Sequence, residues 1–167
     1  MKLPAALRKK VLAAAGAGAF TIAMALLGGT YGLEGRRYIP YGDVTGVLTV
    51  CDGHTGTDIV RGRKYSDSEC DHLLAQDVRR VRTSVDQLVQ VPLNDYQKAA
   101  LYSFVFNTGT QAFSKSTLLK KLNAGDLEGA CNEMRRWVFA GGREWQGLRS
   151  RRETERLLCL AEDSHAF

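Results

Sequence analysis

The sequence predicts an α+β fold, with a small β-hairpin lobe and a larger helical lobe joined by a long helix and separated by a cleft. Residues 38–60 combine a short strand-like stretch with many turn dipeptides, whereas the chain from residue 66 onwards shows helical periodicity interrupted by proline and glycine. A length of 167 residues and an apolar content of 44% suit one packed globular body of ordinary size.

The small lobe is predicted around residues 47–51, the most strand-like stretch of the chain. Turn signals precede it at Gly42-Asp43 and Thr45-Gly46, and others follow at Asp52-Gly53 and Thr55-Gly56. Short strands bounded by such turns are typical of a hairpin.

A long helix should connect the lobes. Ser66 and Glu69 have the spacing of a capping box, so the helix begins there and runs to about residue 89. Its apolar positions recur at helical spacing and form one stripe: Leu74, Val78, Val81, Val85 and Leu88. This stripe is the face that we expect to pack on the helical lobe.

The helical lobe follows Pro92, which breaks the chain. Asn94 or Asp95 then caps an apolar core helix over residues 96–107, which ends at Gly109. Shorter helices are predicted at about 115–124, 126–138 and 148–160, with a turn at Gly141-Gly142.

The N-terminal segment looks like a membrane-targeting sequence. Residues 2–10 are basic, and residues 11–33 form an uncharged run of 23 residues. A helix of that length can cross a bilayer core of about 30 Å, and the basic flank predicts that the N-terminus stays in the cytoplasm. The run is weakly apolar, with five glycines and seven alanines, so we expect it to enter the membrane and to be able to leave.

Three other interpretations of this segment compete. Ala23-Met24-Ala25 fits the cleavage site of a signal peptide, although the run is long for one. A permanent anchor is the second alternative. A buried helix of a soluble protein is the third, and the lack of a polar stripe disfavours it.

The charge distribution argues against a nucleic-acid partner. The net charge is +5, but residues 1–30 contain four basic groups and no acid, which leaves 19 basic against 18 acidic groups in the remainder. We interpret the arginine runs at residues 79–82 and 149–152 as solvated helix faces rather than a phosphate-binding track.

Four cysteines occur without the closely spaced pairs of a zinc site, and we expect neither a metal nor a cofactor. In an exported protein an even number permits two disulfides, with three possible connectivities. We predict Cys51–Cys70 and Cys131–Cys159, since each pair joins segments that the predicted elements make neighbours. Four buried free thiols are the alternative.

Glu34, Asp43 and Thr49 are the candidate catalytic residues. Cleavage of a glycosidic bond needs a protonated acid on one side of the sugar and an ionised group on the other. Glu34 ends an apolar segment, where desolvation would raise its pKa, while Asp43 lies at a polar turn and can stay charged. Thr49 adds a hydroxyl that can fix a water molecule. The spacing alone is common, and an ordinary surface carboxylate is the alternative for either acid.

The sequence that flanks these residues shows a specific resemblance to a known family. GLEG, YIPYGD and LTVCDGHTG flank the three positions, and YSDSEC, ALYSFVFNTG and WVFAGGREWQGLRSRRETERLLCL follow. Over about residues 32–160 the chain resembles the phage lysozymes of glycoside hydrolase family 24, in particular lambdoid endolysins. The resemblance implies a lysozyme-like fold and inverting hydrolysis of the β-1,4 bond between N-acetylmuramic acid and N-acetylglucosamine in peptidoglycan, at host lysis. Glu34 is then the acid, and Asp43 with Thr49 holds the attacking water.

The leader resembles the signal-anchor-release segments of some lambdoid endolysins. This implies a segment 1–33 and a catalytic domain 34–167. The chain would use the export machinery, stay tethered to the inner membrane through residues 11–33, and later be released to the periplasm of a Gram-negative host as a monomer. We hypothesise that membrane insertion holds Glu34 away from its partners, and that release lets residues near 20–34 form the first helix. In some members of that family a cysteine inside the segment adds control through a disulfide. The leader here has no cysteine, so this control is not expected.

Other residues have mainly structural interpretations. By resemblance His54 pairs with Asp77. We also predict that Arg149 or Arg152 forms an ion pair near Glu34 at the cleft. Trp137 and Trp145 could stack on sugar, although a core position is the more common role. Two functions other than hydrolysis stay open: a lytic transglycosylase that uses Glu34 alone, and a non-catalytic wall-binding module.

Overall fold

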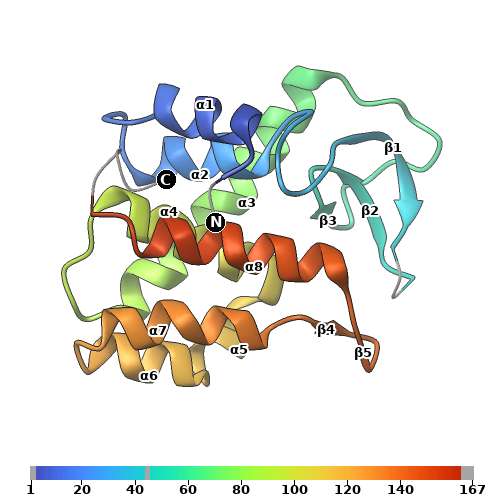
Figure 1. The fold of residues 1–167 in the computed structure, drawn as a ribbon. Coiled ribbons are helices and arrows are strands. Elements are labelled where there is room, and N and C mark those ends of the chain that lie inside the picture. Colours follow the sequence, from blue (N-terminus) through green and yellow to red (C-terminus); the bar gives the residue numbers. More distant parts are fainter. Residues whose placement is uncertain (1–2, 44–45, 163–167) are drawn as a thin grey trace.

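The computed structural model describes residues 3–43 and 46–162. The small lobe contains an antiparallel sheet of β1 (Arg37–Gly42), β2 (Leu48–Cys51) and β3 (His54–Thr55), in that spatial order. The long helix α3 (Asp67–Leu88) follows the sheet and leads into the helical lobe (Figure 1). The predicted α+β architecture is therefore confirmed.

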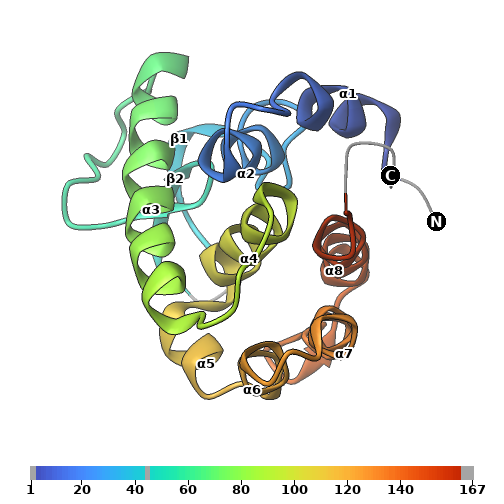
Figure 2. The same ribbon diagram turned by 90° about the vertical axis from the view of Figure 1, so that its left-hand side faces the viewer.

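Helix α4 (Asp95–Thr108) is the centre of the helical lobe. Figure 2 shows it surrounded by the other helices, and its residues from Ala99 to Val105 are all buried. The remaining elements of this lobe follow in chain order: α5 (Thr110–Ser114), α6 (Thr117–Asn123), α7 (Leu127–Glu133), the 3₁₀ helix η1 (Met134–Arg136), β4 (Phe139–Ala140), β5 (Arg143–Glu144) and α8 (Gln146–Cys159).

The N-terminal segment forms two short helices, α1 (Ala5–Ala13) and α2 (Ala19–Leu27), that pack on the body. The chain breaks between them because Gly16 and Gly18 take the left-handed φ angles of +82° and +89°. Within the described part of the chain, no helix has the length and apolarity needed to cross a membrane.

Helix α2 corrects two expectations. The helix expected near residues 20–34 ends at Leu27, and a loop carries the chain onwards. A buried helix was disfavoured because the segment lacks a polar stripe, yet Ile22 and Leu26 have no exposed surface. No polar stripe is needed, since α1, α3 and α4 all contact α2.

The predicted cross-links and caps are confirmed. Disulfides join Cys51 to Cys70 and Cys131 to Cys159, so that β2 is tied to α3 and α7 to α8. Ser66 caps α3 in a complete capping box with Glu69. Asn94, rather than Asp95, caps α4 in the same way.

Some elements differ from the predictions. Helix α5 was not expected, and the Gly141-Gly142 turn joins two short strands that form a separate hairpin. The helix expected over residues 126–138 is shorter, because α7 ends at Glu133 and is followed by a 3₁₀ turn. Thr45, part of one predicted turn, lies outside the described residues.

Candidate active site

Glu34 lies in the loop between α2 and β1, and this loop folds back over the end of α2. The backbone N–H groups of Leu33 and Glu34 donate to the carbonyl oxygens of Leu26 and Leu27 at 3.0 and 3.3 Å. A Cβ atom at Gly32 would lie 2.1 Å from the Leu27 oxygen, so only glycine fits this turn. The turn thus fixes the backbone that carries the acid.

The Glu34 carboxyl is held between the small lobe and α8. Its side chain is 13% exposed, and Arg151 Nη1 lies 2.7 Å from Oε1, although that oxygen has no well-aligned hydrogen bond. On the other side, Gly53 is so close that a Cβ atom there would lie 3.2 Å from Oε2. Burial raises the pKa of Glu34, the charge of Arg151 opposes this rise, and the net shift is upward.

Arg151 belongs to a buried charge cluster on α8. Its Nε donates to Glu155 Oε1 at 2.9 Å, and its Nη2 donates to the Ser103 carbonyl oxygen at 3.2 Å. The Ser103 hydroxyl donates to Glu155 Oε1 at 2.7 Å. Glu155 has no exposed surface. The guanidinium that faces Glu34 is therefore oriented by a carboxylate and a carbonyl behind it.

The prediction that Arg149 or Arg152 pairs with the acid is wrong. Arg149 is exposed and pairs with Glu144, while Arg152 turns inward and pairs with Glu155. The interpretation of the run at 149–152 as a solvated face fails for the same reason. Arg152 is only 1% exposed, because a buried carboxylate one helical turn away compensates its charge.

Asp43 and Thr49 are brought together by a shared partner, Val47. Asp43 follows β1, and its Oδ1 accepts a hydrogen bond from the Val47 N–H at 2.9 Å. Thr49 lies on β2 opposite Tyr41, and its hydroxyl donates to the Val47 carbonyl oxygen at 3.1 Å. Thr49 is 4% exposed. Its hydroxyl lone pairs can accept from a water molecule.

A cavity of about 490 Å³ opens beside the acid. It is lined by the acid loop and β1, through Thr30, Glu34, Gly35, Arg36, Arg37, Tyr38 and Tyr41. Asp43 and Thr49 are not among these lining residues, although Tyr41 is the strand partner of Thr49. The cavity therefore gives a substrate access to Glu34 along β1.

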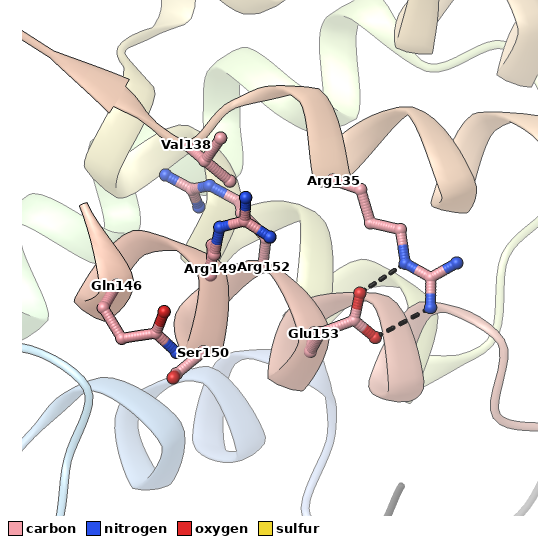
Figure 3. Close-up of a pocket in the computed structure, with 7 residues that line it drawn as sticks. All are labelled: Arg135, Val138, Gln146, Arg149, Ser150, Arg152 and Glu153. Carbon is pink, nitrogen blue, oxygen red and sulfur yellow. Dashed lines mark hydrogen bonds and ion pairs between the residues drawn. The ribbon is translucent and has the colours of Figure 1, made fainter. Parts of the chain in front are cut away.

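A second cavity, of about 480 Å³, is lined by α8 together with Arg135 of η1 and Val138. Figure 3 shows its lining side chains, with Arg135 and Glu153 paired at one edge and Gln146, Arg149 and Ser150 along the helix. Ser150 directly precedes Arg151, the partner of Glu34.

His54 forms the predicted pair with Asp77. Its Nδ1 lies 2.7 Å from Asp77 Oδ2, and its Nε2 lies 3.2 Å from Asp58 Oδ1. Burial lowers the pKa of His54, but the hydrogen bonds to Asp77 and Asp58 outweigh it, and the pKa is raised. The pair links β3 to α3, so the interaction is structural.

The two tryptophans have different surroundings. The Trp137 ring packs edge-on against Phe104, with centroids 5.3 Å apart, as a core residue would. Trp145 donates to the Ala140 carbonyl oxygen at 2.9 Å, and the Arg143 guanidinium lies 4.3 Å from its ring centroid. Stacking of Trp145 on sugar stays a prediction.

Comparison with known proteins places this architecture in a family. The sequence profile named Phage lysozyme matches residues 31–155. The chain belongs to the phage lysozyme family. It is therefore a glycoside hydrolase of the lysozyme type, and the lysozyme-like fold expected from the sequence is confirmed. Cys51–Cys70 and both candidate carboxylates, Glu34 and Asp43, lie inside the matched range.

Individual relatives support the same assignment. The chain is 50% identical to a SAR-endolysin of Bacteriophage PS119, covering 96% of this chain and 98% of the relative. It is 48% identical to a SAR-endolysin of Enterobacteria phage P21, covering 95% and 98%. The active form of the P1 phage endolysin Lyz superimposes with a TM-score of 0.72 at 25% identity, covering 93% of this chain and 92% of that one.

Sequence reasoning missed several residues around the acid of this lysozyme. Arg151 and Glu155 are four residues apart on α8, and this spacing is a signal that could have indicated an ion pair. Asp52 and Arg36 gave no comparable signal. They lie 16 residues apart, and their contact depends on how the small lobe folds.

Proposed function

We propose that this lysozyme cleaves the β-1,4 bond between N-acetylmuramic acid and N-acetylglucosamine with Glu34 as general acid, during lysis of the host cell. The observation that carries the proposal is the Glu34 carboxyl, which is buried, has a raised pKa and borders a cavity. A general acid must hold its proton at the working pH and still reach the leaving oxygen. Burial provides the first condition, and the cavity provides the second.

Activation of the attacking water is assigned to Asp43 and Thr49. Asp43 accepts a backbone hydrogen bond through Oδ1, and we assign its carboxylate the role of general base that takes a proton from the attacking water. The Thr49 hydroxyl would orient that water. Inverting enzymes place the water between two carboxyl groups that are roughly 6.5–9.5 Å apart. We propose this arrangement in the substrate complex, with inversion at the sugar.

Arg151 has a supporting part in this mechanism. While Glu34 is protonated, Arg151 remains compensated by Glu155. After proton transfer, the same guanidinium faces the newly formed Glu34 carboxylate at 2.7 Å. The charge that develops during bond cleavage thus meets a preorganised cation.

We also propose that residues 1–33 act as a signal-anchor-release segment and residues 34–167 as the catalytic domain. The relatives described above are named SAR-endolysins. The chain would be exported, tethered to the inner membrane through residues 11–33, and released to the periplasm as a monomer. In the released form α2 supplies buried side chains such as Ile22 and Leu26. Cleavage after Ala25 would remove most of this helix, which favours release of the intact segment.

The test of the proposed function is the lysis of outer-membrane-permeabilised Gram-negative cells, measured as the rate at which the turbidity of the suspension falls. Glu34→Gln should lower the rate by several orders of magnitude, and Asp43→Asn should lower it strongly. Glu128→Gln is the matched control, since Glu128 is exposed on α7. Equal lysis by Glu34→Gln and wild type, with both proteins folded, would contradict the assignment of the acid.

Product analysis separates hydrolysis from the alternatives. Mass spectrometry of released fragments should show reducing ends, whereas a lytic transglycosylase would give anhydro sugars. Inversion predicts that the first product is the α anomer, which NMR can detect before the anomers equilibrate. A wall-binding module without catalytic activity would release no fragments.

A further inference from the structure

Asp52 contacts one residue that precedes Glu34 in the sequence and one that follows it. It lies in the turn between β2 and β3 and is 1% exposed. Its Oδ1 accepts a hydrogen bond from the Gly29 N–H at 3.0 Å, and its Oδ2 accepts from Arg36 Nε and Nη2 at 3.0 and 2.7 Å. Gly29 precedes Glu34, and Arg36 follows it. One carboxylate therefore joins the two ends of the loop that carries the acid.

Arg36 extends this connection to α3. Its side chain is 5% exposed, and its Nη1 and Nη2 also pair with Asp67 Oδ1 at 2.8 Å and Asp71 Oδ1 at 2.6 Å. These partners raise the pKa of Arg36 despite its burial, so it stays charged. A guanidinium with partners on two elements has little freedom to move, and the loop end attached to it is held with it.

The turn that holds Asp52 is itself anchored. The preceding residue, Cys51, is joined by a disulfide to Cys70 of α3 and has a φ of +58°. The following residue, Gly53, lies against the Glu34 carboxyl. The three consecutive residues 51–53 thus contact α3, the acid loop and the acid. A fixed turn of this kind can set the position of a neighbouring side chain.

We propose that Asp52 is a positioning residue, which places the Glu34 carboxyl for proton transfer by holding Gly29 and Arg36 together. Asp52 is 1% exposed and is not among the lining residues of the cavity beside Glu34, so its side chain is not placed to contact a substrate there. Its contribution is therefore to the rate of the chemical step and not to substrate binding. The proposal rests on the proposed function, in which Glu34 is the general acid.

The consequence of losing this contact is a change in kcat at nearly constant KM. A misplacement of a catalytic group by about 1 Å can cost about 100-fold in rate. In Asp52→Ala both ends of the loop lose their shared acceptor, and we expect kcat to fall by about 10- to 100-fold. Asp52→Asn retains an oxygen for the Gly29 N–H but loses the charge facing Arg36, so its loss should be smaller.

The test measures kcat and KM of the purified full chain on soluble, uncrosslinked peptidoglycan strands, at a temperature where circular dichroism shows every variant folded. Asp95→Ala is the control, because Asp95 is exposed on α4 and far along the chain from the loop. The expected result is a graded fall of kcat from wild type through Asp52→Asn to Asp52→Ala, with KM unchanged. If Asp52→Ala does not fold, the comparison of Asp52→Asn with wild type and with Asp95→Ala tests the same point.

Two outcomes would overturn the proposal, and they are distinguishable from failure of the proposed function. Wild-type kcat in folded Asp52 variants, with Glu34→Gln inactive, would show that Asp52 does not position the acid. A rise in KM at unchanged kcat would assign Asp52 to binding instead. Activity of Glu34→Gln equal to wild type would reject the proposed function itself, and the positioning role with it.

Discussion

Replacing Glu155 by glutamine tests how much the buried charge cluster contributes to stability. The Glu155 carboxylate has no exposed surface, accepts from the Ser103 hydroxyl at 2.7 Å and from Arg151 at 2.9 Å, and pairs with Arg152. Glutamine keeps the shape but leaves two buried guanidinium groups without their shared anion. Removing one partner of a buried ion pair costs about 3–5 kcal/mol. In a chain of this size, Tm should then fall by about 6–20 °C.

Thermal unfolding followed by circular dichroism at neutral pH, with the disulfides intact, measures this loss. Glu153→Gln is the matched control on the same helix, because Glu153 pairs with Arg135, which is 50% exposed. An exposed pair contributes less than about 1 kcal/mol. If Glu155→Gln lowers Tm no more than Glu153→Gln does, the reasoning that burial amplifies this interaction is refuted.

Three further predictions concern the acid and its surroundings. The hydrogen bond to Asp77 raises the pKa of His54, so the pair stabilises the fold below the unfolded pKa of about 6.5 and loses this effect as pH rises through the folded pKa. In urea unfolding, His54→Asn should therefore lower the free energy of unfolding more at about pH 6 than at about pH 9. Because the pKa of Glu34 is raised, its ionisation destabilises the fold, and Glu34→Gln should be more stable than wild type at about pH 8 but not at about pH 4; equal unfolding curves at both pH values would contradict this. Gly53→Ala should lower kcat by about 100-fold and cost about 1–2 kcal/mol of stability, since Gly53 has a φ of +90° and abuts the acid; an unchanged kcat would argue against this contact.

Features that depend on neighbouring residues could be predicted from the sequence. The capping box of Ser66 and Glu69 and the end of α4 at Gly109 are examples, since the caps satisfy backbone groups with side chains a few positions away. The disulfide pairs also followed from the order of the predicted elements. The three candidate catalytic residues came from a resemblance in their spacing and flanking sequence.

Features set by tertiary contacts could not be predicted. The short helix α5 has few residues and no cap of its own, so nothing local marks it. Arg151 and Arg152 look like exposed helix residues until Glu155 is found buried between them. The environment of Glu34 depends on Gly53, which is distant in sequence and is brought close only by the β2–β3 turn.

The packing of α2 in the core restricts which mutations this protein can tolerate. The buried positions of α2 must suit a lipid environment, in the proposed tethered form, and a close-packed protein interior in the released form. A larger apolar residue at Ala23, which has no exposed surface, would favour retention in the bilayer and overfill the core. A polar residue there would weaken membrane entry and packing together. Alanine, which occurs at positions 19, 23 and 25, is acceptable in both environments, so the composition of α2 reflects a compromise between them.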